Sequence, residues 1–168
     1  NLIADYKKDL NERKINLDDD YIKFIRYGQH YIDKNGSGIL AYISNNSFID
    51  GITHRQMRKH LLESFDKIYI LDLHGSAKKN ETALDDSKDE NVFDIQQGVS
   101  INIFVKTGKN KKNELGQVFH IDLFGNREFK YSTLNDNDLR KLDFKQLSYE
   151  QPYYFFVPKQ LSDKKYDS

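Results

Sequence analysis

Helical and strand-like patterns of apolar residues alternate along the first two thirds of the chain. The first helical pattern covers residues 21–32, and its apolar stripe consists of Ile22, Phe24, Ile25, Tyr27, Tyr31 and Ile32. The acids at 18–20 suit the start of this helix, and Gly36 can adopt the left-handed conformation that ends one. Residues 39–43 are then apolar in succession, which predicts a strand buried on both faces.

A second helix and a second strand follow closely. Residues 53–56 form a Thr-x-x-Gln capping box at the start of a helix that runs to Phe65. Residues 67–73 read as another buried strand. Because strand, helix and strand fit within about 35 residues, the pattern predicts an α/β protein with parallel strands. The charged stretch 74–91 predicts a long loop, and such loops are usually functional or mobile.

The last third of the chain has weaker patterns. Residues 99–105 alternate as a strand does, and residues 117–125 predict another strand, either its hairpin partner or the start of a new region. Residues 135–147 predict a short amphipathic helix, and residues 153–159 a final short strand.

Composition limits the compartment and the partners. The 168 residues suffice for one domain and a little more, and their formal net charge is zero, so a DNA contact would need a local basic patch. Cysteine is absent and the five histidines lack the spacing of zinc ligands, so no metal site is expected. With no signal peptide and no long apolar run, we expect a cytoplasmic protein without a membrane partner. The chain begins at Asn1, as a piece of a longer protein would, although processing or numbering gives the same start.

Several segments taken together resemble one enzyme family. They are an amphipathic helix, GILAYISNNSFIDG (38–51), HRQMRKHLLESF (54–65), KIYILDLHG (67–75), a charged loop, and NVFDIQQGVSINIFVK (91–106). This order is similar to the C-terminal half of the catalytic domain of gamma-class adenine-N6 DNA methyltransferases, as found in single-chain type II and type I single-polypeptide restriction–modification enzymes. The resemblance covers residues 17–107, and ILDLHG with DENVFDIQQGV is its most specific part.

The resemblance implies a fold. It is an α/β, partial Rossmann-like fold of the S-adenosylmethionine-dependent methyltransferases, with residues 39–43 as strand five, 68–73 as strand six and 99–105 as strand seven. In that fold strand seven lies antiparallel between the other two. Residues 1–107 would be the C-terminal half of the methyltransferase domain, and residues 108–168 a connecting region and the start of a target-recognition region.

The resemblance also implies an activity for the parent protein: transfer of a methyl group from S-adenosylmethionine to N6 of a flipped adenine in double-stranded DNA. Two signatures of the family are missing here, the glycine-rich cofactor loop and the Asn-Pro-Pro-Tyr loop that grips the target amino group. We therefore expect no catalytic residue in this chain, no specific binding of S-adenosylmethionine, and no activity of the isolated piece.

Phe93 is the main candidate for a binding residue. An adenine must leave the base stack before its N6 can be methylated, and the flipped base needs a flat partner. In the family an aromatic residue just before strand seven forms one wall of the adenine pocket, and Phe93 has that position. The alternative is a ring that merely closes the end of the sheet.

Other polar residues have both a functional and a structural interpretation. Asn45, Asn46 and Ser47 follow a strand end, so they could line the substrate cleft, or serve only as turn residues. Candidates for DNA-phosphate contact are Arg55, Arg58, Lys78 and Lys79, and the alternative for each is a solvated surface.

Two further functions remain open. A metal-dependent nuclease could use Asp72 with the Glu128-x-Lys130 pair, although acids and lysines are frequent in so charged a chain. A non-catalytic α/β interaction module is the third possibility. If strands one to four are absent, strand five has an open edge, so we expect self-association, or shielding of that edge by the N-terminal arm.

Overall fold

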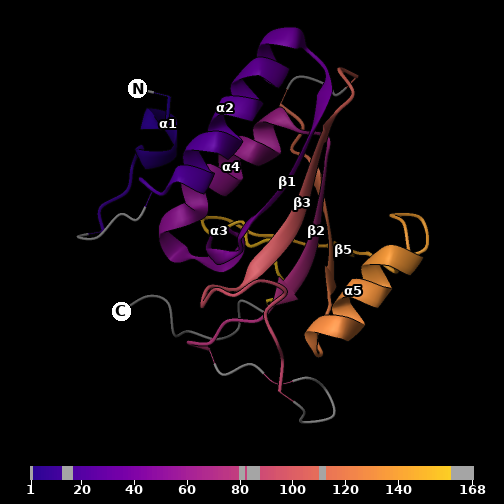
Figure 1. Cartoon of the computed structure of the whole chain (residues 1–168). Coiled ribbons are helices and arrows are strands. Elements are labelled where there is room, and N and C mark those ends of the chain that lie inside the picture. The colour runs from indigo at the N-terminus through magenta and orange to yellow at the C-terminus, as the bar shows by residue number, and fades with distance from the viewer. Residues whose placement is uncertain (1, 13–16, 80–81, 83–87, 110–112, 160–168) are drawn as a thin grey trace.

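The residues that the structure describes form a sheet of five strands. The computed structural model describes residues 2–12, 17–79, 82, 88–109 and 113–159. The strands are β1 (Gly38–Asn45), β2 (Lys67–His74), β3 (Val99–Lys106), β4 (Gln117–Asp122) and β5 (Lys145–Leu147), and they lie in the order β1-β3-β2-β4-β5 (Figure 1). The helices are α1 (Ala4–Lys7), α2 (Asp20–Asn35), α3 (Ser47–Asp50), α4 (Arg55–Ser64) and α5 (Arg127–Asp136), with a 3-10 turn at Ile52–His54.

The inserted strand lies where the family resemblance implies. β3 pairs antiparallel with β1 from Gly38↔Lys106 to Asn45↔Val99, and antiparallel with β2 on its other side. β1 and β2 therefore run in the same direction with β3 between them, which confirms the predicted adjacency of the three segments.

β4 is not the hairpin partner of β3, which was one of the two predictions for residues 117–125. It pairs parallel with β2, from Lys67↔Gln117 to Asp72↔Asp122. A close backbone approach at Gly116 accompanies this pairing: its N–H donates to Leu62 O at 2.8 Å, and an added Cβ there would lie 2.0 Å from Phe65 O. This approach brings the chain back to the start of β2. The sheet therefore continues past residue 107, and the proposed division at that residue remains a prediction.

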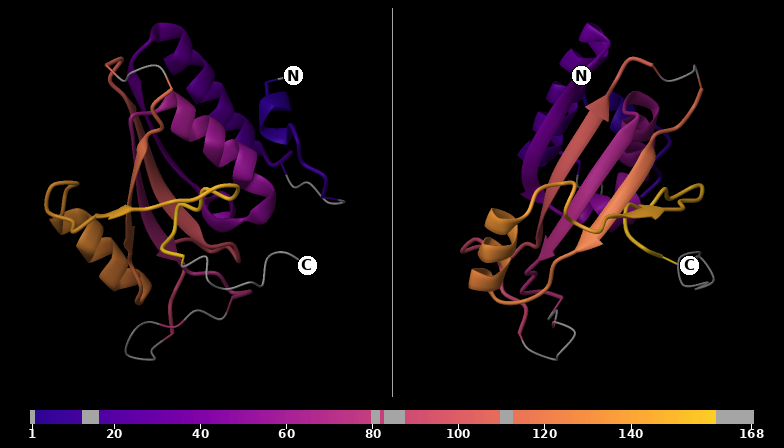
Figure 2. Two further views of the ribbon diagram at one scale, coloured as in Figure 1. Left: turned by 180° about the vertical axis from the view of Figure 1, so that it is seen from behind. Right: turned by 90° about the vertical axis from the view of Figure 1, so that its right-hand side faces the viewer.

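The helices lie on both sides of the sheet. α2 and α4 cover one face, and α5 lies on the opposite side, as two further views confirm (Figure 2). The main core lies under α2 and α4 and includes Ile22, Ile25, Met57, Leu61, Phe65, Ile68, Ile70 and Phe104. A smaller cluster lies on the other face around Leu71, Leu73, Val92 and Val99. None of the described helices is long and apolar enough to cross a membrane.

Strand β1 is less buried than its sequence indicates. Ile39 is 68% exposed and Ile43 is 49% exposed, so the prediction of burial on both faces is wrong. Only Leu40 and Tyr42, on the other face, pack against the main core. The cause is position, because β1 is the end strand of the sheet and α2 covers one of its faces alone.

Three local predictions also need correction. Thr53 is not the N-cap of α4, because it lies within the 3-10 turn that precedes the helix, and the N-cap residue is His54, whose side chain makes no capping hydrogen bond. The helix expected at 135–147 lies at 127–136 instead, where Asn126 caps it by accepting from Phe129 N. Residues 153–159 form no strand; Phe156 N donates to Ile49 O and its ring lies in the main core. The predicted end of α2 is confirmed, since the backbone of Gly36 adopts the left-handed conformation, with φ of 85°.

Candidate functional site

A cavity of about 990 Å³ lies beyond the end of β2 and before the start of β3. Its lining includes Gly75, Ala77, Asn91, Phe93, Gln96 and Arg127. The volume lies at the upper end of the range of small-molecule sites. The carboxyl end of β2 opens here, and open α/β sheets bind their ligands at such ends.

Phe93 lies on the wall of this cavity. Its side chain is 43% exposed, so the ring does not belong to either apolar core. The backbone around it is fixed, because Phe93 N donates to Asn91 Oδ1 at 2.8 Å and Phe93 O accepts from Arg127 at 3.1 Å. A half-exposed ring on a fixed backbone can offer a flat face to a ligand without reordering the loop.

Side chains of α5 hold the loop that carries Phe93. Arg127 Nε donates to Asn91 O at 2.8 Å, and Tyr131 Oη donates to Val92 O at 2.6 Å. Lys130 Nζ donates to Glu90 O and to Leu73 O, both at 2.6 Å. Consecutive carbonyls of residues 90–93 thus each receive a hydrogen bond from one helix, since positions 127, 130 and 131 share a helix face. We call this set of contacts the α5 clamp.

A buried ion pair forms the centre of the α5 clamp. Lys130 Nζ lies 2.7 Å from Asp89 Oδ1, and both side chains are 0% exposed. Asp89 also accepts from Gly75 N at 2.6 Å and from Gly125 N at 2.8 Å. The Asp89 carboxylate therefore joins the end of β2, at Gly75, to the segment from Gly125 to Lys130. The sequence patterns did not reveal this role; the spacing of Arg127, Lys130 and Tyr131 on one helix face was the available signal.

The three residues predicted to line a cleft, Asn45, Asn46 and Ser47, have different environments in the structure. Asn45 Oδ1 accepts from Ser47 N at 2.8 Å and from Ser47 Oγ at 2.6 Å, which is the turn chemistry named as the alternative. Asn46 is 4% exposed and donates to Asp72 Oδ1 at 2.8 Å, so it lies inside the protein rather than on a cleft surface. Ser47 is exposed at the start of α3.

The phosphate candidates differ in what their charges contact. Lys78 and Lys79 are exposed, in the segment that follows the cavity-lining residue Ala77. Lys79 Nζ lies 3.5 Å from Asp50 Oδ2. Arg55 pairs with the carboxylate of Glu12, which reduces the charge it could offer to DNA.

Arg58 needs a correction, because it is 0% exposed and no phosphate can reach it. Its guanidinium donates to three backbone carbonyls, those of Phe48 at 2.7 Å, Gly51 at 2.7 Å and Tyr153 at 2.5 Å. Burial lowers the pKa of Arg58 to about 9, with the charge of Asp50 opposing the shift. Arg58 therefore fixes α3 and the C-terminal segment to α4.

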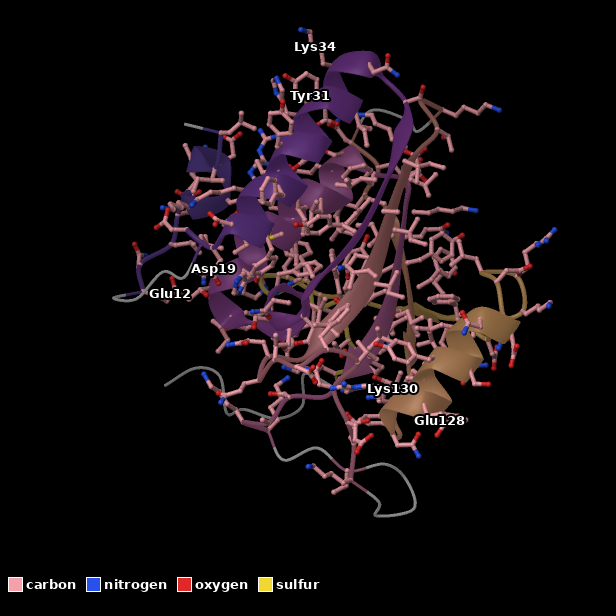
Figure 3. All side chains as sticks on the ribbon, in the orientation of Figure 1. Glu12, Asp19, Tyr31, Lys34, Glu128 and Lys130 are labelled. Carbon is pink, nitrogen blue, oxygen red and sulfur yellow. The ribbon has the colours of Figure 1, made fainter. Side chains whose placement is uncertain are left out.

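The residues suggested for a nuclease do not converge. Lys130 points from α5 towards the strand ends and Glu128 points away from them (Figure 3). Lys130 is bound to Asp89 and two carbonyls, whereas Glu128 is exposed. The pair Glu128-x-Lys130 therefore does not form a catalytic unit with Asp72.

Asp72 instead lies beside two residues that the sequence patterns did not single out, His120 and Asp122. One ligand atom from each of the three lies within 4.8 Å of the others. His74 Nε2 also contacts Asp122 Oδ1 at 2.7 Å, and its ring stacks on Phe124 at 3.8 Å between centroids. The available signal was the pair of strand candidates that each carry an aspartate near the end.

Burial and neighbouring groups together shift the pKa values of this cluster. Desolvation raises the pKa of Asp72, and the charges of His74 and His120 with a hydrogen bond from Asn46 oppose the shift. Desolvation lowers the pKa of His120. Burial alone would raise the pKa of Asp122. The hydrogen bond from His74 and the charges of His74 and His120 outweigh burial and hold this pKa below its ordinary value.

Comparison with known proteins adds structural relatives. No protein-family model matches the chain, and no curated protein matches it. Among solved structures, the ATP-dependent Type ISP restriction–modification enzyme LlaBIII bound to DNA matches 96% of this chain with a TM-score of 0.80 and 27% sequence identity.

Two further solved structures share the fold. The DrdV–DNA complex, solved by cryo-EM, matches 98% of this chain with a TM-score of 0.79 and 24% identity. A nuclease-deletion mutant of the Type ISP enzyme LlaGI, in complex with a DNA substrate mimic, matches 96% with a TM-score of 0.78 and 21% identity. The chain spans only 16% of DrdV, 11% of LlaBIII and 13% of LlaGI. Its architecture is therefore that of one segment of these much longer, DNA-bound proteins.

Proposed function

We propose that this chain is the C-terminal part of the methyltransferase domain of a restriction–modification enzyme. The parent enzyme transfers a methyl group from S-adenosylmethionine to N6 of a flipped adenine in double-stranded DNA. The observation that carries the proposal is the likeness to the DNA-bound enzyme LlaBIII over 96% of the chain at 27% identity. The antiparallel β3 between β1 and β2 supports it, because this is the strand arrangement that the resemblance implies.

In this proposal Phe93 is a wall of the adenine site. A base inside a duplex cannot reach an enzyme's reacting groups until it is extruded, and stacking on an aromatic ring stabilises the extruded state by about 1–3 kcal/mol. Phe93 suits this role because its ring is half-exposed on a large cavity and its backbone is held by Arg127.

The remaining parts of the reaction belong to segments outside this chain. The glycine-rich cofactor loop and the Asn-Pro-Pro-Tyr loop are absent from the sequence, so the binding site for S-adenosylmethionine and the groups that polarise N6 would be supplied by the rest of the parent protein. The isolated chain is accordingly expected to be inactive and to show no specific binding of the cofactor in calorimetry.

DNA phosphates would be contacted near the cavity by Lys78 and Lys79. Both are exposed, and the Lys79 side chain stays 50% exposed in its pair with Asp50, whereas Arg55 is 16% exposed in its pair with Glu12 and Arg58 is buried. Removing one lysine that neutralises a phosphate reduces the salt dependence of DNA affinity by about one unit of slope. Charge reversal at Lys78 in the parent enzyme should therefore weaken DNA binding and flatten its salt dependence, and unchanged values would remove Lys78 from the interface.

The decisive experiment uses the Phe93→Ala variant of the parent enzyme. Loss of stacking should reduce methylation by roughly 5- to 150-fold, the equivalent of about 1–3 kcal/mol. Fluorescence of 2-aminopurine at the target position should fall in parallel, since it reports the extruded base.

Two variants serve as controls for that experiment. Phe93→Tyr keeps the flat ring and should retain most of the activity. Phe129→Ala removes another exposed phenylalanine, 53% accessible, that does not line the cavity, and should leave flipping unchanged. Full methylation and full base extrusion by Phe93→Ala would show that the ring only closes the end of the sheet.

A further inference from the structure

A second polar site lies at the carboxyl ends of the two parallel strands β2 and β4. Asp72 and Asp122 are direct partners in the register of this pair. His120 precedes Asp122 by two residues, so both side chains lie on the same face of the sheet. One carboxylate or imidazole atom from each of the three residues lies within 4.8 Å of the others.

The imidazole of His120 supplies an independent observation. His120 is 2% exposed, and its Nε2 makes no hydrogen bond in the part of the chain that the structure describes. The carboxylate oxygen Oδ1 of Asp122 lies 3.7 Å from this nitrogen, beyond hydrogen-bonding distance. A buried ring nitrogen without a partner is costly, unless a ligand uses its lone pair.

We propose that Asp72, His120 and Asp122 form a binding site for a divalent transition-metal ion. One imidazole nitrogen and two carboxylates make a donor set suited to Zn²⁺ or Mn²⁺, whereas Mg²⁺ and Ca²⁺ prefer sites made of oxygen alone. An ion there would join the ends of β2 and β4 across the sheet. The site lies outside the Phe93 cavity lining and does not depend on the proposed methyltransferase function.

Access and orientation fit this assignment. The side chain of Asp122 is 41% exposed, so an ion can enter from solvent, while Asp72 is 5% exposed and held by Asn46. His74 Nε2 contacts Asp122 Oδ1 at 2.7 Å, the kind of outer contact that orients a carboxylate ligand. Three protein ligands leave at least one coordination position for water.

The competing explanation is that His74 takes the place of a cation. Its Nδ1 lies 3.7 Å from Asp72 Oδ2 while its Nε2 contacts Asp122, so a protonated His74 could neutralise both carboxylates. This explanation gives His120 Nε2 no role and predicts no metal binding. The two explanations can therefore be separated by titration.

The test uses the full chain after treatment with a chelator. Isothermal calorimetry with ZnCl₂ should show one ion per chain, and titration with CoCl₂ should produce visible absorption from Co²⁺ bound to nitrogen and oxygen. At a hundredfold excess over the dissociation constant, Zn²⁺ should raise Tm by about 5–10 °C. MgCl₂ at the same concentration should give a much smaller rise.

Matched variants locate the ion. Asp122→Asn, at the most exposed ligand, and His120→Gln should each weaken Zn²⁺ binding at least tenfold. His60→Gln removes a surface histidine that lies beside Glu63, and should bind as the unmodified chain does. Absence of Zn²⁺ binding, or binding that Asp122→Asn leaves unchanged, would overturn the proposal, and Asp122→Asn keeps the test usable if His120→Gln fails to fold.

Discussion

The two flanks of the sheet differ in the kind of surface they present. On the flank of β1 and α2, apolar side chains face solvent: Ile39 is 68% exposed, Phe24 59% and Tyr27 55%. At the strand ends beside α5, charged side chains are buried, and Lys130 and Asp89 meet there with no exposure of either side chain. Hydrophobic side chains are therefore exposed to solvent on the β1 flank, whereas ionic side chains are buried on the α5 flank.

This contrast indicates which contacts the chain completes by itself. Buried charges are stable only when they are paired and hydrogen-bonded, and the α5 clamp satisfies that requirement within the chain. Exposed apolar residues beside an open strand edge indicate contacts that another surface would complete. The N-terminal arm does not cover the edge in the described residues, since α1 packs against α4 and β1 pairs with β3 alone.

Removing the cation of the buried ion pair should have the greatest effect on stability. Lys130→Met leaves the Asp89 carboxylate buried without its cation, which should lower the free energy of unfolding by about 3–5 kcal/mol. Urea denaturation monitored by circular dichroism measures this loss. Lys145→Met is the matched control, because the Lys145 side chain is 71% exposed and should change stability by less than about 1 kcal/mol. Equal stabilities of the two variants would contradict the role given to the α5 clamp.

A second, pH-dependent effect concerns another buried polar residue, His54, in the 3-10 turn before α4. His54 is 5% exposed beside α4, and desolvation, helped by the charge of Arg58 and opposed by Asp50, lowers its pKa to about 4. Above pH 6.5 the imidazole is neutral in both the folded and the unfolded state. Between pH 6.5 and about 4 the unfolded state binds a proton that the folded state resists. The free energy of unfolding should therefore fall through this window, by about 3 kcal/mol in total.

The measurement compares unfolding of the unmodified chain with His54→Phe at several pH values. His54→Phe keeps a ring of similar shape and cannot titrate, so the difference between the two curves isolates this residue. His60→Phe, at a partly exposed position, should keep the full pH dependence. Parallel curves for His54→Phe and the unmodified chain would show that His54 does not control the acid limit.

The strands of the core could be predicted from the sequence, because the spacing of apolar residues indicates which segments are buried. The patterns of 39–43, 67–73 and 99–105 each became a strand, and the resemblance supplied their order. Exposure at Ile39 and Ile43 was missed, because an apolar run looks the same whether its second face is covered by this chain or by another surface.

The polar contacts were predicted poorly for a different reason. Arg58 and Lys130 look like surface cations in the sequence, yet both are buried on backbone carbonyls, those of Phe48 and Leu73 among them. His120 and Asp72 meet because β4 lies parallel beside β2, next to the close backbone approach at Gly116. Such contacts depend on the tertiary structure, and the hydrophobic pattern of the sequence does not indicate which distant residues will meet.

A weaker effect is expected at the exposed apolar residues beside β1. The isolated chain should self-associate through the open edge of β1, because unpaired strand edges flanked by apolar residues favour pairing with another chain. Sedimentation velocity over a range of concentrations measures the dissociation constant. Ile39→Lys should raise it about tenfold, equivalent to about 1.4 kcal/mol, by placing a charge beside the edge. Leu139→Lys, at a 44% exposed position beyond α5, should leave it unchanged. A chain that stays monomeric at all concentrations, while amides of residues 39–43 exchange quickly, would mean that the edge is open and has no partner in a second copy.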